Sequence, residues 1–485
     1  MNTSKGQPTG MTGFTIVWAG QIVSVLASTM TQFALTIWAY QETGSATALG
    51  IISAAFIVPF LLLSPIAGVM VDRHNRKLMM MVSDLTAVVP TAGILILYTS
   101  GSLQIWHLYV AAVINGLGNT FQWPAYSAAI STMVPKEYYS RANGMMSLVE
   151  SVPGVLAPLL AGMLLPIIKL TGILFIDVVT FLLAIVALLA VHISQPARTV
   201  EGQAERGSIL KEAAYGFKYI FARRGLFGLL TFFIILNFVI GLSGSLFSPF
   251  ILERTNQDST ILGIVTSANA IGAVIGGLLV SLWGGFKRRM TSIFLGEALT
   301  GLFLLVIVGL GRSVPVWLIG AVIGGIFPIF TNGASQAIWQ AKVAPDVQGR
   351  VFSARRMIAW SVGPVTPILA GFLADYVTEP AMQSQTWLAR TFGWMVGNDP
   401  GAGMALQFVL TGIIYMLVVL IVYLFVPHVR NLEDELPDHD HIQKVNEQLV
   451  LSPPTTTPAL PGTIHQGKGA PDASDDQTRG KNAPD

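Results

Sequence analysis

The stretch "RANGMMSLVESVPGVLAPLLAG" (141–162) recurs without a gap as "RVFSARRMIAWSVGPVTPILAG" (350–371). A second pair of segments, earlier in each copy, aligns Asp84 with Glu297. Similarity that recurs at a fixed spacing indicates an internal duplication. The chain is therefore predicted to consist of two copies of one structural unit. The identities in the longer match include Arg141 with Arg350, Gly154 with Gly363, Pro158 with Pro367, and Ala161-Gly162 with Ala370-Gly371.

The composition indicates a membrane protein. Of 485 residues, 52% are hydrophobic and 11% are charged, whereas about a quarter of the residues in a soluble domain are charged. Apolar runs of about 18 or more residues can cross the bilayer as helices. We therefore predict an all-α integral membrane protein with twelve transmembrane helices in two six-helix repeats, the first run being retained in the mature protein. The predicted spans are 14–40, 46–70, 78–99, 105–131, 143–166, 171–193, 226–250, 260–283, 290–311, 314–341, 352–377 and 402–426.

The charges of the connecting loops predict the orientation. Loops after the even-numbered spans hold 18 lysines and arginines, whereas those after the odd-numbered spans hold 4. Basic loops resist export, so both termini are expected in the cytoplasm. The net charge of +2 gives no indication of a nucleic-acid partner, and the absence of cysteine excludes disulfides and cysteine-based metal sites.

Four segments are expected along the chain: a six-helix bundle over 1–193, a cytoplasmic linker over 194–225, a second bundle over 226–427 and a tail over 428–485. The linker mixes bases with Ile, Tyr and Phe, which is typical of an amphipathic helix at a membrane surface. The tail is rich in Pro, Thr and Asp and is expected to be disordered. Its "DHDH" (438–441) contains metal-binding residue types, but a flexible acidic tail is a poor metal site, and we predict none.

Polar residues recur at helical spacing in the first and fourth spans of each copy. Such stripes predict a central cavity formed by spans 1, 4, 7 and 10, where repeat-built transporters bind their substrates. The alternative is that these amides only hydrogen-bond neighbouring helices, which contributes about 0.6–2 kcal/mol per contact. The cavity residues predicted from the stripes and from adjacent aromatic side chains are Gln21, Ser24, Ser28, Gln32, Asn115, Asn119, Gln122, Trp123, Tyr126, Asn237, Asn332, Gln336 and Trp339.

The aromatic members of this set, Trp123, Tyr126 and Trp339, could offer a surface to apolar or planar substrates. They could equally face lipid or the protein core.

Four carboxylates lie well inside predicted spans: Asp84, Glu150, Asp177 and Glu297. A buried carboxylate is costly when ionised, which suits a proton carrier. We predict Glu150 as the first candidate for proton coupling and Asp177 as the second. Asp84 and Glu297 have a simpler possible role, which is to pair with loop bases such as Arg73 or Arg289.

No nucleotide-binding GKS or GKT, no HExxH and no G-x-S-x-G occurs in the chain. These motifs would indicate ATP binding, zinc-dependent hydrolysis and a serine nucleophile, respectively. We therefore expect a transporter driven by an ion gradient, without enzymatic activity, cofactor or metal. Its expected partners are the lipid bilayer, a small-molecule substrate and protons, and we expect a monomer.

The stretch "GVMVDRHNRK" (68–77) between spans 2 and 3, together with the two six-span repeats, resembles the major facilitator superfamily over residues 14–426. The family signature is G-x-x-x-D-R-x-G-R-K, and Asn75 replaces its second glycine. In that family the loop is a latch between the two halves. The resemblance thus implies a cytoplasmic latch of Gly68, Asp72, Arg73, Arg76 and Lys77, with Arg355 and Arg356 as neighbours and Asp84 nearby.

Within the superfamily, "QWPAYSAAISTMVPKEYYSRANGM" (122–145) and "NDPGAGMAL" (398–406) are similar to the macrolide-efflux and enterobactin-exporter branch. That similarity implies export of an amphipathic compound across a prokaryotic cytoplasmic membrane, in exchange for protons. "AP-x-x-AG" at 157–162 resembles a weakened antiporter motif, and the family's span-4 arginine falls at Ala112, so its proton relay does not transfer unchanged. Export of an endogenous metabolite such as a siderophore, and a membrane sensor that transports nothing, remain alternatives.

Overall fold

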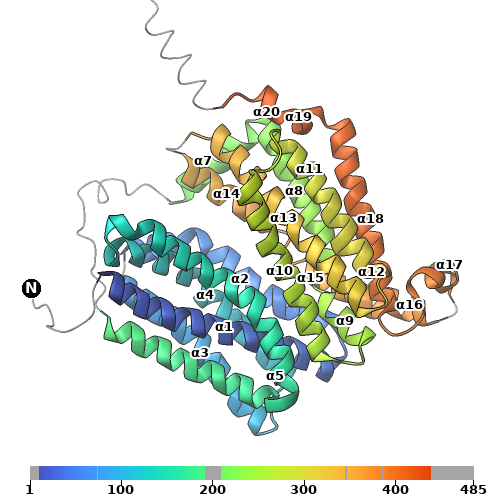
Figure 1. The fold of residues 1–485 in the computed structure, drawn as a ribbon, viewed down its shortest axis with the longest axis horizontal. Coiled ribbons are helices and arrows are strands. Elements are labelled where there is room, and N and C mark those ends of the chain that lie inside the picture. Colours follow the sequence, from blue (N-terminus) through green and yellow to red (C-terminus); the bar gives the residue numbers. More distant parts are fainter. Residues whose placement is uncertain (1–9, 74, 192–208, 345–346, 385, 439–485) are drawn as a thin grey trace, which may run out of the picture. The chain divides into compact units, whose positions relative to one another are not determined.

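The computed structural model describes residues 10–73, 75–191, 209–344, 347–384 and 386–438. Every element in these ranges is a helix (Figure 1). All twelve predicted spans lie mostly in helix, and nine of the described helices are long and apolar enough to cross a membrane. Large apolar side chains are exposed on their outer faces, such as Leu62, Leu282 and Phe425. A helix that is apolar all round is expected where lipid replaces water.

The helices of the first repeat pack mainly on one another, with α5 against α1 and α3, and α4 against α2 and α3. Helix α5 contains two predicted spans and reverses direction near Lys169, whose backbone is not helical (φ 57°, ψ 179°) (Figure 1). The elements are α1 (Gly10–Thr43), α2 (Ala46–Arg73), α3 (Arg76–Thr99), α4 (Ile105–Met133), η1 (Lys136–Tyr138) and α5 (Tyr139–Ala190).

The second repeat has the same order of spans but more interruptions. The span predicted over 290–311 contains a π-helical segment, and the span over 352–377 is broken at 361–365. Pro364 and Pro367 explain that break, because proline cannot donate a backbone hydrogen bond within a helix. The elements are α7 (Ile209–Phe221), α8 (Arg224–Gly244), α9 (Phe247–Arg254), α10 (Ser259–Trp283), α11 (Arg289–Thr300), η2 (Gly301–Ile307), α12 (Val308–Leu310), α13 (Val314–Lys342), α14 (Gln348–Trp360), α15 (Thr366–Leu373), η3 (Ala374–Thr378), α16 (Glu379–Gln383), α17 (Trp387–Val396), α18 (Ala402–Phe425), α19 (Pro427–Arg430) and α20 (Leu432–Glu435).

Helix α7 is the described part of the predicted linker, and it packs on protein. A Cβ atom at Gly216 would lie 2.3 Å from the carbonyl oxygen of Arg350, so α7 lies directly against α14. Ile220 is fully buried, and the Tyr219 hydroxyl donates to the Lys342 carbonyl at 3.3 Å. The apolar face that suggested a membrane-surface helix is thus partly covered by the second repeat. Residues 192–208 lie outside the described part.

Residues 428–438 fall in the segment predicted to be a disordered tail, but they form most of α19 and all of α20 and pack on the second repeat. The Glu433 carboxylate accepts from the backbone N–H groups of Arg289 and Met290 at 3.2 and 3.0 Å, which caps α11. The Lys342 ammonium lies 2.9 Å from the Asp438 carboxylate. These polar contacts anchor a segment whose composition alone predicts no structure. The rest of the tail, with most of "DHDH", lies outside the described residues.

The two repeats meet closely where α5 packs on α10. A Cβ atom at Gly263 would lie 2.3 Å from the Pro158 carbonyl oxygen, and one at Gly162 would lie 2.5 Å from the Ser259 carbonyl oxygen. The Ser259 hydroxyl donates to the Gly162 carbonyl at 3.2 Å. Small residues allow this approach of two backbones, as is usual between membrane helices.

Gly263→Leu is expected to separate α5 from α10, because the added side chain has no space there. Overpacking costs roughly 1–3 kcal/mol, which corresponds to an increase of about 5- to 150-fold in the population of the separated state. The measurement is the maleimide labelling rate of Ser259→Cys, since the chain has no other cysteine. Gly277→Leu on the same helix is the control, because a Cβ atom there meets nothing within 4 Å. Equal labelling rates in the two variants would contradict the prediction.

Candidate substrate and proton site

Asp84 lies on α3, buried between two residues of the predicted cavity stripes. Its side chain is 1% exposed. Gln21 on α1 donates through Nε2 to Asp84 Oδ2 at 3.2 Å, and Gln122 on α4 donates through Nε2 to Oδ1 at 3.2 Å. The two amides also lie 3.5 Å apart, Nε2 of Gln122 to Oε1 of Gln21. One carboxylate thus joins three helices, and both of its donors are uncharged.

Tyr126 lies one helical turn after Gln122 in the same stripe. Its hydroxyl is buried and has no hydrogen-bond partner in the part of the chain that the structure describes. Residues four apart lie on the same face of a helix, so Tyr126 lies on the face of α4 from which Gln122 contacts Asp84. Burying a hydroxyl without a hydrogen-bond partner costs free energy, and a bound group that accepts from the hydroxyl would remove that cost. The Asp84 site therefore includes an unused donor.

Asp177 forms a second buried carboxylate site, where α5 packs against α1 and α3. It is also 1% exposed. The Ser28 hydroxyl donates to Asp177 Oδ1 at 2.9 Å. Of the neighbouring threonines, Thr91 donates to the Ala87 carbonyl at 3.1 Å, and the buried Thr31 hydroxyl has no hydrogen-bond partner among the described residues. Hydroxyl groups supply hydrogen bonds but no positive charge, so this site resembles that of Asp84 in its electrostatics.

The remaining stripe residues of the first repeat differ in exposure. The stripe of α1 contributes to both carboxylate sites, because Gln21 contacts Asp84 and Ser28 contacts Asp177. The other members are Ser24, which is buried, Asn115, which is half-buried, and Gln32 and Asn119, which are exposed.

In the second repeat, Arg355 of α14 is held by residues of α13. Its guanidinium donates to Gln336 Oε1 at 3.0 Å and to the Ser335 hydroxyl at 3.1 Å. The guanidinium carbon lies 5.1 Å from the ring centroid of Trp339, which is buried. Arg355 was expected beside the cytoplasmic latch, but its described partners are the predicted cavity residue Gln336, its neighbour Ser335 and the ring of Trp339. The α13 stripe faces α14 at this level, which brings these groups together.

The other predicted residues of the second repeat are exposed. Asn237 on α8 donates through Nδ2 to the Ala359 carbonyl at 3.3 Å, which links α8 to α14. Asn332 on α13 and Arg356 on α14 are exposed.

Glu297, the repeat partner of Asp84, has different surroundings. It accepts a hydrogen bond from the hydroxyl of Tyr415 on α18. Arg289, its suggested partner, instead donates to the Ala337 carbonyl at 3.4 Å. The described hydrogen bonds of Asp84 also come from groups other than a loop base, namely the amide side chains of Gln21 and Gln122. The internal repeat therefore matches the positions of the two acids but not their neighbours.

The predicted latch is described only in part. Lys77 donates to the carbonyls of Leu189 and Val191 at 3.1 and 2.8 Å, which ties the loop to the end of α5. Asn75, which replaces the signature glycine, accepts from the Leu78 N–H at 3.2 Å and caps α3. The surroundings of the other latch residues, and of two further predicted site residues, lie outside the described part: Gly68, Asp72, Arg73, Arg76, Trp123 and Glu150.

Sequence reasoning missed a polar contact between the repeats, at the start of α2. The Asp375 carboxylate of η3 accepts from the Ser45 hydroxyl at 2.7 Å, the Ala46 N–H at 3.0 Å, the Thr47 N–H at 2.9 Å and the Thr47 hydroxyl at 2.7 Å. We call these four residues the Asp375 clasp. The "SAT" of 45–47 has the composition of a helix start, but nothing local indicates that its acceptor lies in the other repeat.

Comparison with known proteins assigns this helical arrangement to a family. A family model described as Major Facilitator Superfamily matches residues 17–246. The solved structure of a bacterial homologue of the human lysosomal transporter Spinster, inward-facing and unoccupied, has a TM-score of 0.64 at 16% identity, covering 87% of this chain and 98% of that one. The structure of a D-xylose-proton symporter has a TM-score of 0.60 at 12% identity, covering 86% and 98%. The chain belongs to the major facilitator superfamily.

Two curated relatives of this major facilitator chain are named as efflux proteins. Macrolide efflux protein A of Streptococcus pyogenes is 28% identical over 365 residues, which are 75% of this chain and 90% of the relative. Multidrug efflux pump Tap of Mycolicibacterium fortuitum is 25% identical over 350 residues, which are 69% and 82%. The predicted family and its all-helical membrane fold are thereby confirmed. The chain is a multi-pass secondary transporter of a small molecule, from a family of transporters rather than enzymes.

Proposed function

We propose that this transporter exports amphipathic compounds across the cytoplasmic membrane in exchange for protons, by alternating access. The observation that carries the proposal is the pair of buried carboxylates, Asp84 and Asp177, whose described hydrogen-bond donors are all uncharged. Burying an ionised carboxylate without a cation is costly. Each site therefore favours a bound proton or a bound cation. The names of the two efflux relatives support the direction and the substrate class.

Asp84 is the proposed site at which a proton and a substrate compete. Gln21, Gln122 and Tyr126 surround it, and the Tyr126 hydroxyl is a donor without a described partner. An amphipathic cation could place its charge against Asp84 and its polar groups against these side chains. Release of the proton would then accompany binding of the substrate. Asp177, with Glu150 as predicted from the sequence, is the proposed proton route.

The proposed organisation is two rocking six-helix halves, 1–193 and 226–427, connected by the linker over 194–225, with both termini in the cytoplasm and one copy per functional unit. Loop charge supports the orientation. The Asp375 clasp and the contact of α5 with α10 join the halves at one end of the spans, which is the end assigned to the outside. An exporter requires that this closure alternate with closure at the other end.

Transport in everted membrane vesicles tests this function. With an interior-acid pH gradient, vesicles that contain the protein should accumulate a macrolide or a cationic dye, and a protonophore should abolish the accumulation. Vesicles from cells without the protein are the control. Accumulation that ignores the pH gradient would exclude proton coupling, and no movement across a broad panel of compounds would exclude export.

Asp177→Asn and Glu150→Gln are each expected to weaken drug-induced proton release. The coupling free energy between two binding sites is typically about 1–3 kcal/mol. Losing the coupling between the proton and the drug should therefore lower gradient-driven export about 5- to 150-fold. The measurement is proton release by purified protein on adding drug, alongside vesicle transport. Glu42→Gln, at an exposed position near the end of α1, is the matched control. Unchanged proton release in both variants would remove Asp177 and Glu150 from the proton route.

A further inference from the structure

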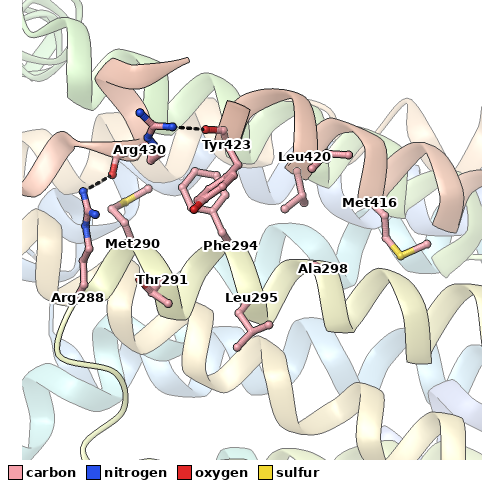
Figure 2. Close-up of a pocket in the computed structure, with 11 residues that line it drawn as sticks. Arg288, Met290, Thr291, Phe294, Leu295, Ala298, Met416, Leu420, Tyr423 and Arg430 are labelled. Atoms are coloured by element: carbon pink, nitrogen blue, oxygen red, sulfur yellow. Dashed lines mark hydrogen bonds between the residues drawn. The ribbon is translucent and has the colours of Figure 1, made fainter. Parts of the chain in front are cut away.

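A groove lies between α11 and α18, apart from both carboxylate sites (Figure 2). Its volume of about 310 Å³ is near the lower end of the range of roughly 300–1,000 Å³ for small-molecule pockets. Phe294 and Tyr423 lie in its middle, and their rings are 5.4 Å apart between centroids. From there the groove continues along the two helices between apolar side chains.

Two arginines lie at one end of this groove, Arg288 before α11 and Arg430 in α19 (Figure 2). Arg430 donates to the Tyr423 carbonyl and to Asn431 Oδ1, each at 3.4 Å, and its guanidinium carbon lies 5.7 Å from the centroid of the Tyr423 ring. These partners are uncharged. A guanidinium has five N–H donors, so two weak hydrogen bonds leave most of its donor capacity unused.

Arg288 uses one of its nitrogens for all of its described hydrogen bonds. That nitrogen donates to the Arg430 carbonyl at 3.2 Å, to Asn431 Oδ1 at 3.1 Å and to the Asp434 carboxylate at 3.0 Å. Asp434 is largely exposed. The charged side chains that line this end of the groove are the two guanidinium groups. The Asp434 carboxylate beside them is solvated, and the Glu433 carboxylate is engaged by the backbone N–H groups of Arg289 and Met290. Both guanidinium groups have N–H donors beyond those used in their described hydrogen bonds, which an anion could accept.

The other end of the groove is apolar and open to the surroundings of the protein. Leu295 on α11 is 42% exposed and Leu420 on α18 is 50% exposed. In a protein that spans the bilayer, such exposed leucines on membrane helices lie against lipid chains. The groove thus combines an end lined by two arginines with an apolar channel, as an anionic phospholipid would require.

We propose that this groove binds one anionic phospholipid, with its phosphodiester at Arg288 and Arg430 and an acyl chain between Leu295 and Leu420. Arginine binds phosphate oxygens through two parallel N–H groups. Basic pockets between membrane helices on the cytoplasmic side are typical sites for anionic headgroups. The lipid would link α11, α18 and α19 from the outside of the bundle. This inference does not depend on the transported substrate.

Native mass spectrometry of the full-length protein with phosphatidylglycerol or phosphatidylcholine tests this proposal. One phosphatidylglycerol should remain bound at lipid concentrations where phosphatidylcholine does not. Arg288→Gln and Arg430→Gln should each weaken its binding about fivefold, given the attraction typical of one base near an anionic surface. Lys287→Gln is the matched control, because Lys287 neighbours Arg288 but does not line the groove.

A second variant separates lipid binding from folding. Leu295→Trp keeps both arginines but fills the channel, so it should also weaken phosphatidylglycerol binding while leaving the thermal unfolding temperature without lipid unchanged. Inorganic phosphate in excess should not displace the lipid, because it cannot occupy the apolar part. Equal binding of both lipids, displacement by phosphate, or an equal loss in Lys287→Gln would each overturn the proposal.

Discussion

Replacing Asp375 by alanine is expected to open the junction between the two repeats and to lower export strongly. The carboxylate accepts four hydrogen bonds from Ser45, Ala46 and Thr47, at 2.7 to 3.0 Å. Two of them come from backbone N–H groups at the start of α2, where a negative charge also interacts favourably with the helix dipole.

The expected size follows from the hydrogen bonds that are lost. A hydrogen bond to a charged group typically contributes about 1.5–3 kcal/mol. Losing even two of the four would therefore shift the equilibrium between the closed and open arrangements by two or more orders of magnitude. A transporter fixed in the open arrangement at this end cannot complete its cycle, and we expect gradient-driven export to fall to background.

Cysteine labelling separates this opening from misfolding. Ser259→Cys reports on the same end of the molecule, because its backbone lies against α5. Adding Asp375→Ala should raise its labelling rate by an impermeant maleimide from outside the cell, whereas Asp399→Ala, at an exposed acid of the following loop, should not. An unchanged rate in Asp375→Ala would show that the clasp does not hold the halves together.

The internal repeat and the apolar runs were sufficient to predict the long helices. Each predicted span is mostly helical, because a segment in lipid has no other way to satisfy its backbone hydrogen bonds. The helices α16, α17, α19 and α20 were not predicted, since short helices depend on tertiary contacts rather than on their own propensity. The capping of α11 by Glu433 is such a contact.

The candidate site was predicted in its residues but not in its pairings. Helical spacing placed Gln21 and Gln122 on striped faces, yet it could not identify Asp84 as the group between them. A stripe defines one face of a helix, whereas the neighbour of that face depends on how three helices pack. Arg355 lies beside Gln336 for the same reason. The Asp375 clasp was missed because 330 residues separate Asp375 from Ser45.

Asp84→Asn is expected to abolish proton-coupled export while leaving the fold intact. Asparagine has the same shape, its oxygen can still accept from Gln122, and its amide can donate to Gln21 Oε1, so the contact between α1, α3 and α4 persists. What is lost is the negative charge and the exchangeable proton. Because coupling requires that proton and substrate compete for one charge, accumulation against a gradient should disappear, whereas slow downhill movement should remain.

The matched control is Glu297→Gln, which changes the repeat partner of Asp84 in the same way. Glu297 is also buried, but its hydrogen bond comes from Tyr415 on α18 rather than from a stripe residue. Both variants should be inserted in the membrane in equal amounts and unfold at similar temperatures. Vesicle accumulation at several imposed pH gradients should be flat for Asp84→Asn and should follow the gradient for Glu297→Gln. The opposite pattern, with accumulation flat for Glu297→Gln and gradient-dependent for Asp84→Asn, would assign proton coupling to Glu297 in the second repeat instead of Asp84 in the first.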